Sequence, residues 1–335
     1  MRVSFHPPVL FISLNVQVEN KKGFRHLNES VFVLALEGEI VEPKAMKTNL
    51  LLLIFNFSIL IFNSSFAQPT IQWQKCLGGT GDETASSVQQ TSDGGYIVAG
   101  ESWSNDGNVT GNHDTTGTNC DYWVVKLDGS GNLQWQKSFG GIDYDSGGYI
   151  QQTSDGGFIL AGQSLSNDGD VSNHHGFSGS GDYWIVKLDV IGNIQWEKSL
   201  GGYDNEGATE IKLTIDGGYI ITGFSYSVDG DVTGNHGSQD YWIVKLDGSG
   251  NIQWQKCLGG TYDDFAQSIQ QTSDGGYVIA GETNSNDGDV TGNHGQFDSW
   301  VVKLDGNGNL QWQNHWEELV MTVEFLFSKL LTGAM

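Results

Sequence analysis

Pairs of acidic or amide side chains two residues apart recur four times along this chain. In the last copy, Asp287 and Asp289 flank a glycine, and His294 follows five residues later. Carboxylate and amide oxygens at this spacing resemble part of the D-x-[DN]-x-[DN]-G pattern of calcium loops. One interpretation of the pattern is a Ca²⁺ cofactor, with ligands at Asp106, Asn108, Asp168, Asp170, Asp229, Asp231, Asp287 and Asp289.

The same loops also have a purely structural interpretation. The third acidic position and the distal glutamate of a calcium loop are absent. Asp and Asn side chains commonly make turns by bonding to nearby backbone amides. The sequence favours this turn-forming role and leaves calcium open as the alternative.

Other chemistry-bearing residues are repeated in the same way. His113, His174 and His236 follow the earlier pairs, and no complementary group lies near them in the sequence, so they are expected to be solvated. Acidic pairs after a double glycine, such as Asp263 and Asp264, resemble the two carboxylates of a glycosidase. A glycosidase needs its acid and base in different environments, whereas every unit here repeats the same group. We therefore predict no catalytic residue.

The composition excludes several classes of partner and cofactor. The 335 residues carry a formal net charge of -24, which argues against a nucleic-acid partner, because phosphate binding needs clustered Lys and Arg. The three cysteines, Cys76, Cys120 and Cys257, show no C-x-x-C spacing, so neither a zinc site nor a dense disulfide framework is indicated. With 47 glycines and 4 prolines, the chain suits short aromatic strands joined by glycine turns.

The elements that must position these loops come from a repeat. The marker I/L-Q-W begins near residues 71, 133, 194, 252 and 310. Each unit of about sixty residues holds four strand candidates, which in the last complete unit are residues 266–272, 276–282, 299–305 and 309–313. Asp-Gly and Asn-Gly turns join them as antiparallel hairpins. A lone strand of the fourth kind, residues 71–77, precedes the first unit.

Four antiparallel strands per unit match a propeller blade better than a solenoid repeat. The predicted fold is all-β, a β-propeller of about four four-stranded antiparallel blades that form part of a larger ring. Nine of the eleven tryptophans fall at two repeat positions, and we predict that they belong to the core.

The two ends of the chain differ from the repeats at 68–313. Residues 46–67 form a signal-peptide pattern, with Lys47, an apolar run over 50–62 and a small-residue cleavage site at Ala67. The run is too short for a membrane span, so no transmembrane anchor is expected. Residues 1–45 are interpreted as an upstream over-extension, with a genuine leader as the alternative. Residues 314–335 are interpreted as a frameshifted tail.

The motifs GG-x-x-x-D, QQTSDGGYIVAG, DYWVVKLD and GNIQWQK together resemble the propeller repeats of secreted and outer-surface proteins of Bacteroidota. Many of those proteins end in a type IX secretion sorting domain, and none is visible in this sequence. The resemblance implies a secreted or outer-surface location. We therefore expect a non-enzymatic binding or scaffold module for a glycan or protein at the cell surface. The alternatives are an exported carbohydrate-active or other hydrolytic enzyme, or a calcium-stabilised glycan-binding protein.

Overall fold

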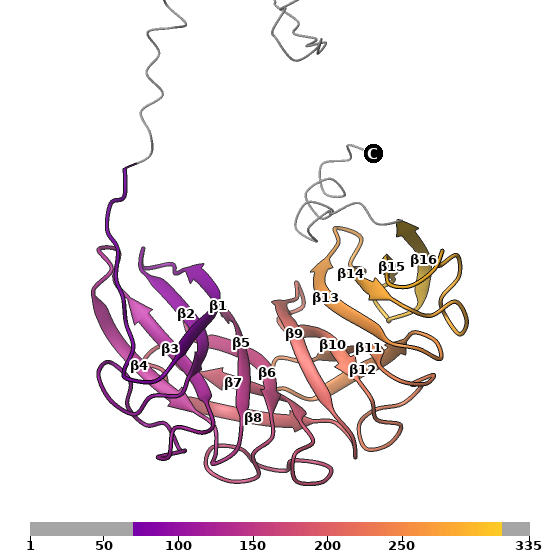
Figure 1. Ribbon diagram of the computed structural model, residues 1–335. Coiled ribbons are helices and arrows are strands. Elements are labelled where there is room, and N and C mark those ends of the chain that lie inside the picture. Colours follow the sequence, from indigo (N-terminus) through magenta and orange to yellow (C-terminus); the bar gives the residue numbers. More distant parts are fainter. Residues whose placement is uncertain (1–69, 317–335) are drawn as a thin grey trace, which may run out of the picture. The chain divides into compact units, whose positions relative to one another are not determined.

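The computed structural model describes residues 70–316, and all sixteen of their strands lie in four antiparallel sheets of four (Figure 1). The first sheet consists of β1 (Glu83–Gln90), β2 (Tyr96–Ser102), β3 (Asp121–Leu127) and β4 (Leu133–Phe139). The second consists of β5 (Asp145–Gln152), β6 (Phe158–Ser164), β7 (Asp182–Leu188) and β8 (Ile194–Leu200). The third consists of β9 (Glu206–Leu213), β10 (Tyr219–Ser225), β11 (Asp240–Leu246) and β12 (Ile252–Leu258). The fourth consists of β13 (Asp264–Gln271), β14 (Tyr277–Thr283), β15 (Asp298–Leu304) and β16 (Leu310–Trp316).

Strands pair with their chain neighbours within each sheet, which confirms the predicted all-β class and the four-stranded antiparallel units. The predicted strands of the last unit agree with β13 to β16 to within three residues. The expected turns are also present. Between β13 and β14 the Gly275 amide donates to the Thr272 carbonyl at 2.9 Å, and Gly275 has a φ of 83°. Glycine reaches this positive φ without the steric cost that a side chain would bring.

The third strand is the most buried element of the first three sheets, and in the fourth it is as buried as the second strand. Every residue of β7 and of β11 is buried, including a lysine, and Trp184, Trp242 and Trp300 are fully buried. This burial explains why those strands alternate so weakly between apolar and polar residues, because both faces of each sheet are covered. The prediction that these tryptophans are core residues is confirmed.

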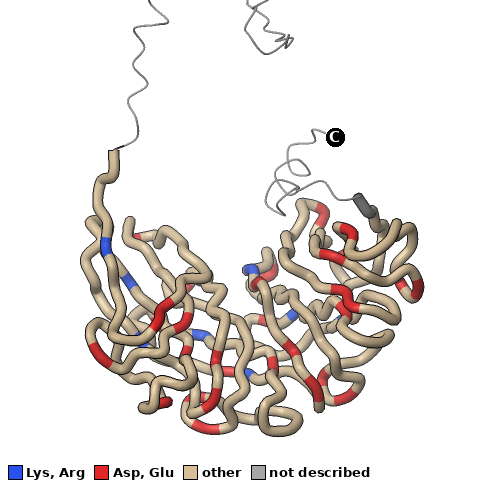
Figure 2. The backbone as a smooth tube through the Cα atoms, viewed as in Figure 1, with Lys and Arg blue, Asp and Glu red and all other residues tan. Residues whose placement is uncertain are grey.

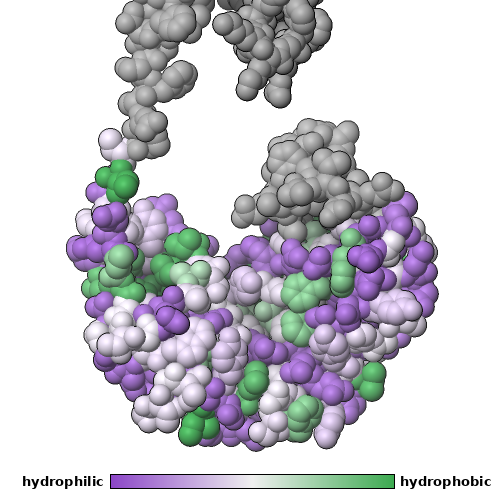
Figure 3. Space-filling model, viewed as in Figure 1, coloured by the Kyte–Doolittle hydropathy of each residue, from purple (hydrophilic) through white to green (hydrophobic). Residues whose placement is uncertain are grey.

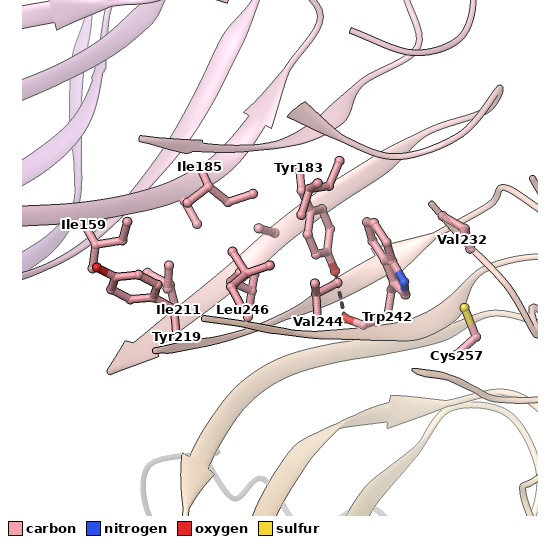
Figure 4. Packing of buried hydrophobic residues seen from close by; sticks show 14 residues of the cluster. Ile159, Tyr183, Ile185, Ile211, Tyr219, Val232, Trp242, Val244, Leu246 and Cys257 are labelled. Atoms are coloured by element: carbon pink, nitrogen blue, oxygen red, sulfur yellow. Dashed lines mark hydrogen bonds between the residues drawn. The ribbon is translucent and has the colours of Figure 1, made fainter. Parts of the chain in front are cut away.

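Successive sheets are held together by their third strands (Figure 4). The Tyr183 hydroxyl of the second sheet donates to the Trp242 carbonyl of the third at 2.9 Å, and the two rings lie 4.5 Å apart. Tyr241 makes the same bond to Trp300 of the fourth sheet at 3.1 Å. A separate cluster of buried apolar side chains fills each of the three boundaries between sheets.

The sheets fan out from their first strands. β1 contacts β5, β5 contacts β9, and β9 contacts β13, so these four strands lie on the inner side of the sheets in Figure 1. Side chains join them, since the Gln152 amide of β5 donates to Gln89 of β1 at 2.6 Å. The Ile269 amide of β13 likewise donates to Glu210 of β9 at 2.6 Å. The loops at one edge of every sheet are thereby brought together.

The tryptophans of the fourth strands differ from the prediction, because they are only partly buried. Trp196 packs edge-on against Tyr219 of the next sheet, with ring centroids 5.9 Å apart. A Cβ on Gly250 would lie 3.0 Å from the same indole ring, so the turn between β11 and β12 needs glycine to approach it. Trp312, on β16, is 38% exposed. These rings cover the borders between sheets.

Residues 71–77 were expected to form a strand and do not. The reason is that no ladder of backbone hydrogen bonds joins them to a described strand. Trp73 nevertheless packs on Tyr96 at 5.5 Å, in the manner of a fourth-strand tryptophan against the next sheet. Strand β16 runs to Trp316, three residues past the predicted end of the repeats. The interpretations of residues 1–45, 46–67 and 317–335 lie outside the described residues.

The described residues include no helix long and apolar enough to cross a membrane. All three cysteines are free thiols, with Cys120 and Cys257 buried and Cys76 exposed.

Candidate functional site

The long loop between the second and third strands and the short loop before the first strand meet at one edge of each sheet. We call this edge the loop face, which comprises residues 78–82, 103–120, 140–144, 165–181, 201–205, 226–239, 259–263 and 284–297. The first acidic residue of each predicted calcium pair ties these two loops together. Asp168 accepts the Ile142 amide at 2.8 Å, and Asp229 accepts the Tyr203 amide at 2.8 Å. Asp106 and Asp287 bind the amides of Thr80 and Thr261 in the same way.

The second residue of each pair has a different neighbour. Its backbone amide bonds to the first glycine of the short loop, as Asp170 does to Gly140 at 2.8 Å. The Asp170 carboxylate faces the histidine of the preceding sheet, with 3.8 Å between its Oδ2 and His113 Nε2. Asp231 and Asp289 lie 3.9 and 3.6 Å from the corresponding histidines. In the first unit this position is Asn108, which bonds to Gly78.

The two members of each predicted pair therefore serve different partners. Among residues 70–316, no group of three or more His, Cys, Asp or Glu side chains is placed to hold a metal ion. The first aspartates bond to backbone amides, as a structural role requires, but these amides lie 26 residues away in the short loop and not in the same turn. Calcium binding stays a prediction for titration to test.

One loop histidine of each unit is paired with a buried aspartate at the start of the third strand. The His113 amide and its Nδ1 contact Asp121 Oδ2 at 3.0 and 2.6 Å. His236 contacts Asp240 in the same way, and both aspartates are fully buried. The hydrogen bond to Asp121 raises the pKa of His113 above its ordinary value. The expectation that these histidines lack a complementary group is therefore wrong.

In the second unit the paired histidine is His175, and the sequence-based choice of His174 is wrong. His175 contacts Asp182 Oδ2 through its amide and Nδ1, both at 2.8 Å. His174 occupies the place of an asparagine in the other units, where Asn112 donates to the Ser102 carbonyl at 2.8 Å. The His174 ring is 5% exposed, and neither of its nitrogens has a hydrogen-bond partner.

A second buried carboxylate stands at the start of the first strand of the next sheet. Asp145 accepts the Gly141 amide at 2.7 Å and the Ser166 hydroxyl at 2.9 Å, and it also bonds to Ser164. Burial raises the pKa of Asp145 to about 7, and the charge of Asp121 acts in the same direction, although these hydrogen bonds oppose the shift. Glu206 and Asp264 hold the equivalent position, and burial raises the pKa of both.

The two buried carboxylates approach each other across every boundary between sheets. A Cβ on Gly140 would lie 2.4 Å from Asp145 Oδ2 and 2.9 Å from Asp121 Oδ1, so only glycine fits between them. Gly201 and Gly259 are enclosed in the same way. The Oδ1 atoms of Asp121, Asp182 and Asp240 have no hydrogen-bond partner. Two carboxyls placed together in a buried setting disfavour the ionisation of both at once.

These acid pairs resemble catalytic carboxylates only in their chemistry. Asp121 and Asp145 have no exposed surface, so a substrate cannot reach them. The pair predicted from Asp263 and Asp264 is divided, because Asp264 is buried while Asp263 binds the Ser238 hydroxyl at 2.5 Å in the loops. The buried carboxylates therefore position the loops. A signal for them exists in the sequence, since an acidic residue begins every third strand and another stands four residues after the double glycine of each short loop.

The loop face is rich in acidic residues and has no basic lysine or arginine side chain. Its loops contain twelve aspartates and neither lysine nor arginine. Acidic positions outnumber basic ones throughout the described chain (Figure 2). The exposed large side chains of the loop face are mostly aromatic: Ile142, Phe177, Tyr203, Tyr226, Val228, Tyr262 and Phe297. The hairpin turns at the opposite edge expose aliphatic residues, such as Val190, Ile191 and Ile215. In Figure 3 the apolar residues form separate patches among hydrophilic ones.

Comparisons with known proteins give distant similarities. No known family model matches the chain. A segment of 163 residues is 27% identical to regulatory protein FlaEY of Caulobacter vibrioides, covering 45% of this chain and 17% of FlaEY. A solved protein of unknown function from Bacteroides caccae is similar with a TM-score of 0.28 and 14% identity, over 73% of this chain and 85% of that one. Sqt1 from Chaetomium thermophilum has a TM-score of 0.28 and 11% identity, over 71% and 73% of the two chains.

Proposed function

We propose that this chain is a non-enzymatic binding module that presents its loop face to a partner at the cell surface. The observation that carries the proposal is the composition of that face, with twelve aspartates, no lysine or arginine, and exposed aromatic rings. Exposed aromatic residues are a common feature of recognition surfaces, because they bury large areas at low entropic cost. The histidine–aspartate pairs and the buried acid pairs hold the loops in place, so the loop face is preorganised for binding.

The four sheets are proposed to be blades of a β-propeller and part of a larger ring. Two features support this finer description. First strands of successive sheets contact one another, as expected around an axis. Trp73 packs against the first sheet as the fourth-strand tryptophans pack against the sheets that follow them. Equivalent loops repeated around such an axis give several similar weak sites, which raises the overall affinity for a repetitive partner.

Export through the signal-peptide pattern at 46–67 is part of the proposal, as is an origin similar to the secreted Bacteroidota propeller repeats. The support for both is the sequence pattern. The partner is a glycan or a protein. Calcium-stabilised glycan binding is kept as a variant of this proposal because the loop aspartates supply oxygen ligands.

A binding screen with paired surface variants tests the proposal. The full chain is applied to glycan and peptide arrays, beside a panel of glycoside and ester substrates. Loop-face variant Val228→Ser is compared with Val190→Ser on the opposite edge, since the two valines are 73% and 61% exposed. We expect retention on an array that the loop-face variant weakens and the other keeps. Turnover of a substrate that is abolished by one carboxylate substitution would instead establish an enzyme.

A further inference from the structure

At the boundary between the second and third sheets, the loop face has an aromatic residue where two other units have threonine and one has isoleucine. Thr80 and Thr261 begin two of the short loops after the double glycine, and their hydroxyls donate to Asp106 Oδ2 at 3.0 Å and Asp287 Oδ2 at 2.9 Å. Tyr203 stands at this position before the third sheet. Its amide still donates to Asp229 Oδ1, but, as at Ile142 before the second sheet, no threonine hydroxyl is present to engage the second oxygen. The Asp229 carboxylate is therefore left with acceptor capacity beside an exposed ring.

A second aromatic ring lies next to Tyr203. Phe177, from the long loop between β6 and β7, has its ring centroid 5.5 Å from that of Tyr203, with a 46° angle between the planes. The two side chains are 46% and 59% exposed. An exposed pair of rings at this distance buries little apolar area by itself, so its faces are available to a ligand.

The loop that carries Phe177 is held in place. The Ser180 amide and hydroxyl both donate to the Phe177 carbonyl, at 3.0 and 2.8 Å. Gly176 has a φ of 80°, and a Cβ there would lie 2.4 Å from the Tyr203 carbonyl. The long loop thus touches the short loop through a residue that has to be glycine. This contact preorganises the ring pair before any ligand arrives.

The charge around the ring pair selects the ligand. Asp204 and Asp229 are exposed, and the loop face has no lysine or arginine to neutralise them. The face of an aromatic ring attracts a cation, and arginine combines this contact with a carboxylate bond. A neutral sugar would stack on the rings but leave the carboxylates without a counter-charge.

We propose that Phe177, Tyr203 and Asp229 form a site for a basic side chain, arginine above all, of a partner protein. This inference rests on the proposed function and names the partner's chemistry at one boundary. The guanidinium lies against the two rings and bonds to the Asp229 carboxylate.

The test uses the full chain and a fluorescein-labelled octapeptide of alternating arginine and glycine, measured by fluorescence anisotropy at physiological salt. Tyr203→Thr introduces the residue found at this position in the first and fourth units and leaves the net charge unchanged. Tyr262→Thr is the matched control, since Tyr262 is 61% exposed in the next short loop. We expect Tyr203→Thr to weaken binding about tenfold, as the loss of a cation–π contact does, and Tyr262→Thr to leave it within about twofold.

Phe177→Ser is a second variant for the same affinity measurement, and the melting temperature of each variant shows whether it is folded. Equal affinity of the parent chain and both aromatic variants would overturn the site, as would an equal loss with Tyr262→Thr, which indicates unspecific attraction. Maltoheptaose binding without arginine-peptide binding would overturn the basic partner while leaving the binding module intact. Failure of every probe and of the arrays would overturn both proposals.

Discussion

The buried carboxyl of Asp145 gives the sharpest test of how the sheets are joined. The perturbation is Asp145→Asn, which keeps the side-chain volume and an oxygen acceptor for the Gly141 amide but removes the titratable proton. Burial raises the pKa of Asp145 from 3.8 to about 7. In the unfolded chain the same group has an ordinary aspartate pKa. The folded protein therefore holds a proton between about pH 4 and 7 that the unfolded chain has released.

The sign and size of the effect follow from this difference. Because the folded state binds more protons in this window, the free energy of unfolding falls as the pH rises, by up to about 1.4 kcal/mol per pH unit from this group. A shift of about three pKa units corresponds to about 4 kcal/mol over the whole window. Asparagine does not titrate, so the variant lacks this contribution. Relative to the parent, Asp145→Asn should therefore gain about 4 kcal/mol between pH 4 and pH 8.

The assay is urea unfolding followed by tryptophan fluorescence at half-unit steps from pH 4 to 8. Asp204→Asn serves as the control, because Asp204 is an exposed aspartate of the next short loop. The stability difference between the control and the parent should stay nearly flat over the same range. A parent-to-variant difference that does not change with pH would refute the reasoning, because the carboxyl would then be ionised in the folded protein throughout.

Three further outcomes are expected. Tyr183→Phe removes the hydroxyl that bonds to the buried Trp242 carbonyl and should cost about 1–2 kcal/mol in chemical unfolding, so unchanged stability would show that this bond does not join the sheets. His174→Asn should raise the melting temperature, because asparagine can donate to the Ser164 carbonyl as its counterparts do, with a gain of about 1 kcal/mol; a lower melting temperature would contradict that assignment. Calcium titration by calorimetry tests the loop aspartates as calcium ligands. If calcium produces no heat of binding and no rise in melting temperature, these aspartates are excluded as ligands.

The strands were predictable because their signals are local. Asp-Gly and Asn-Gly turns require positive φ, which glycine supplies, and this fixed the hairpin between β13 and β14 to within one residue at Gly275. The continuous apolar run of β11 indicated a strand covered on both faces, and all of its residues are buried. Where the signal depended on a partner strand, as at residues 71–77, the prediction failed.

Asn173 shows how the repeat constrains a loop position by position. Its φ of 57° is the only positive value among the described non-glycine residues. The equivalent positions are Gly111, Gly234 and Gly292, which also have positive φ. Asparagine tolerates this conformation better than most residues. Counting from this position places His175, and not His174, at the site of the paired histidine, so the alignment of the repeats held information that the spacing to the nearest histidine did not.

By itself, the sequence determined the repeat, the all-β class, the burial of the third strands and the loops that carry the aspartates. Only the tertiary structure decided which side chains meet across a boundary, because Asp145, which approaches Asp121, and Trp242, which bonds to Tyr183, lie on the next sheet, and Tyr183 and Trp242 are 59 residues apart. A periodic sequence offers the same candidate partners in every unit, and the packing of one sheet against the next selects among them. The acid pairs and the Phe177–Tyr203 rings are products of that packing, whereas the histidine–aspartate pairs form within a single unit.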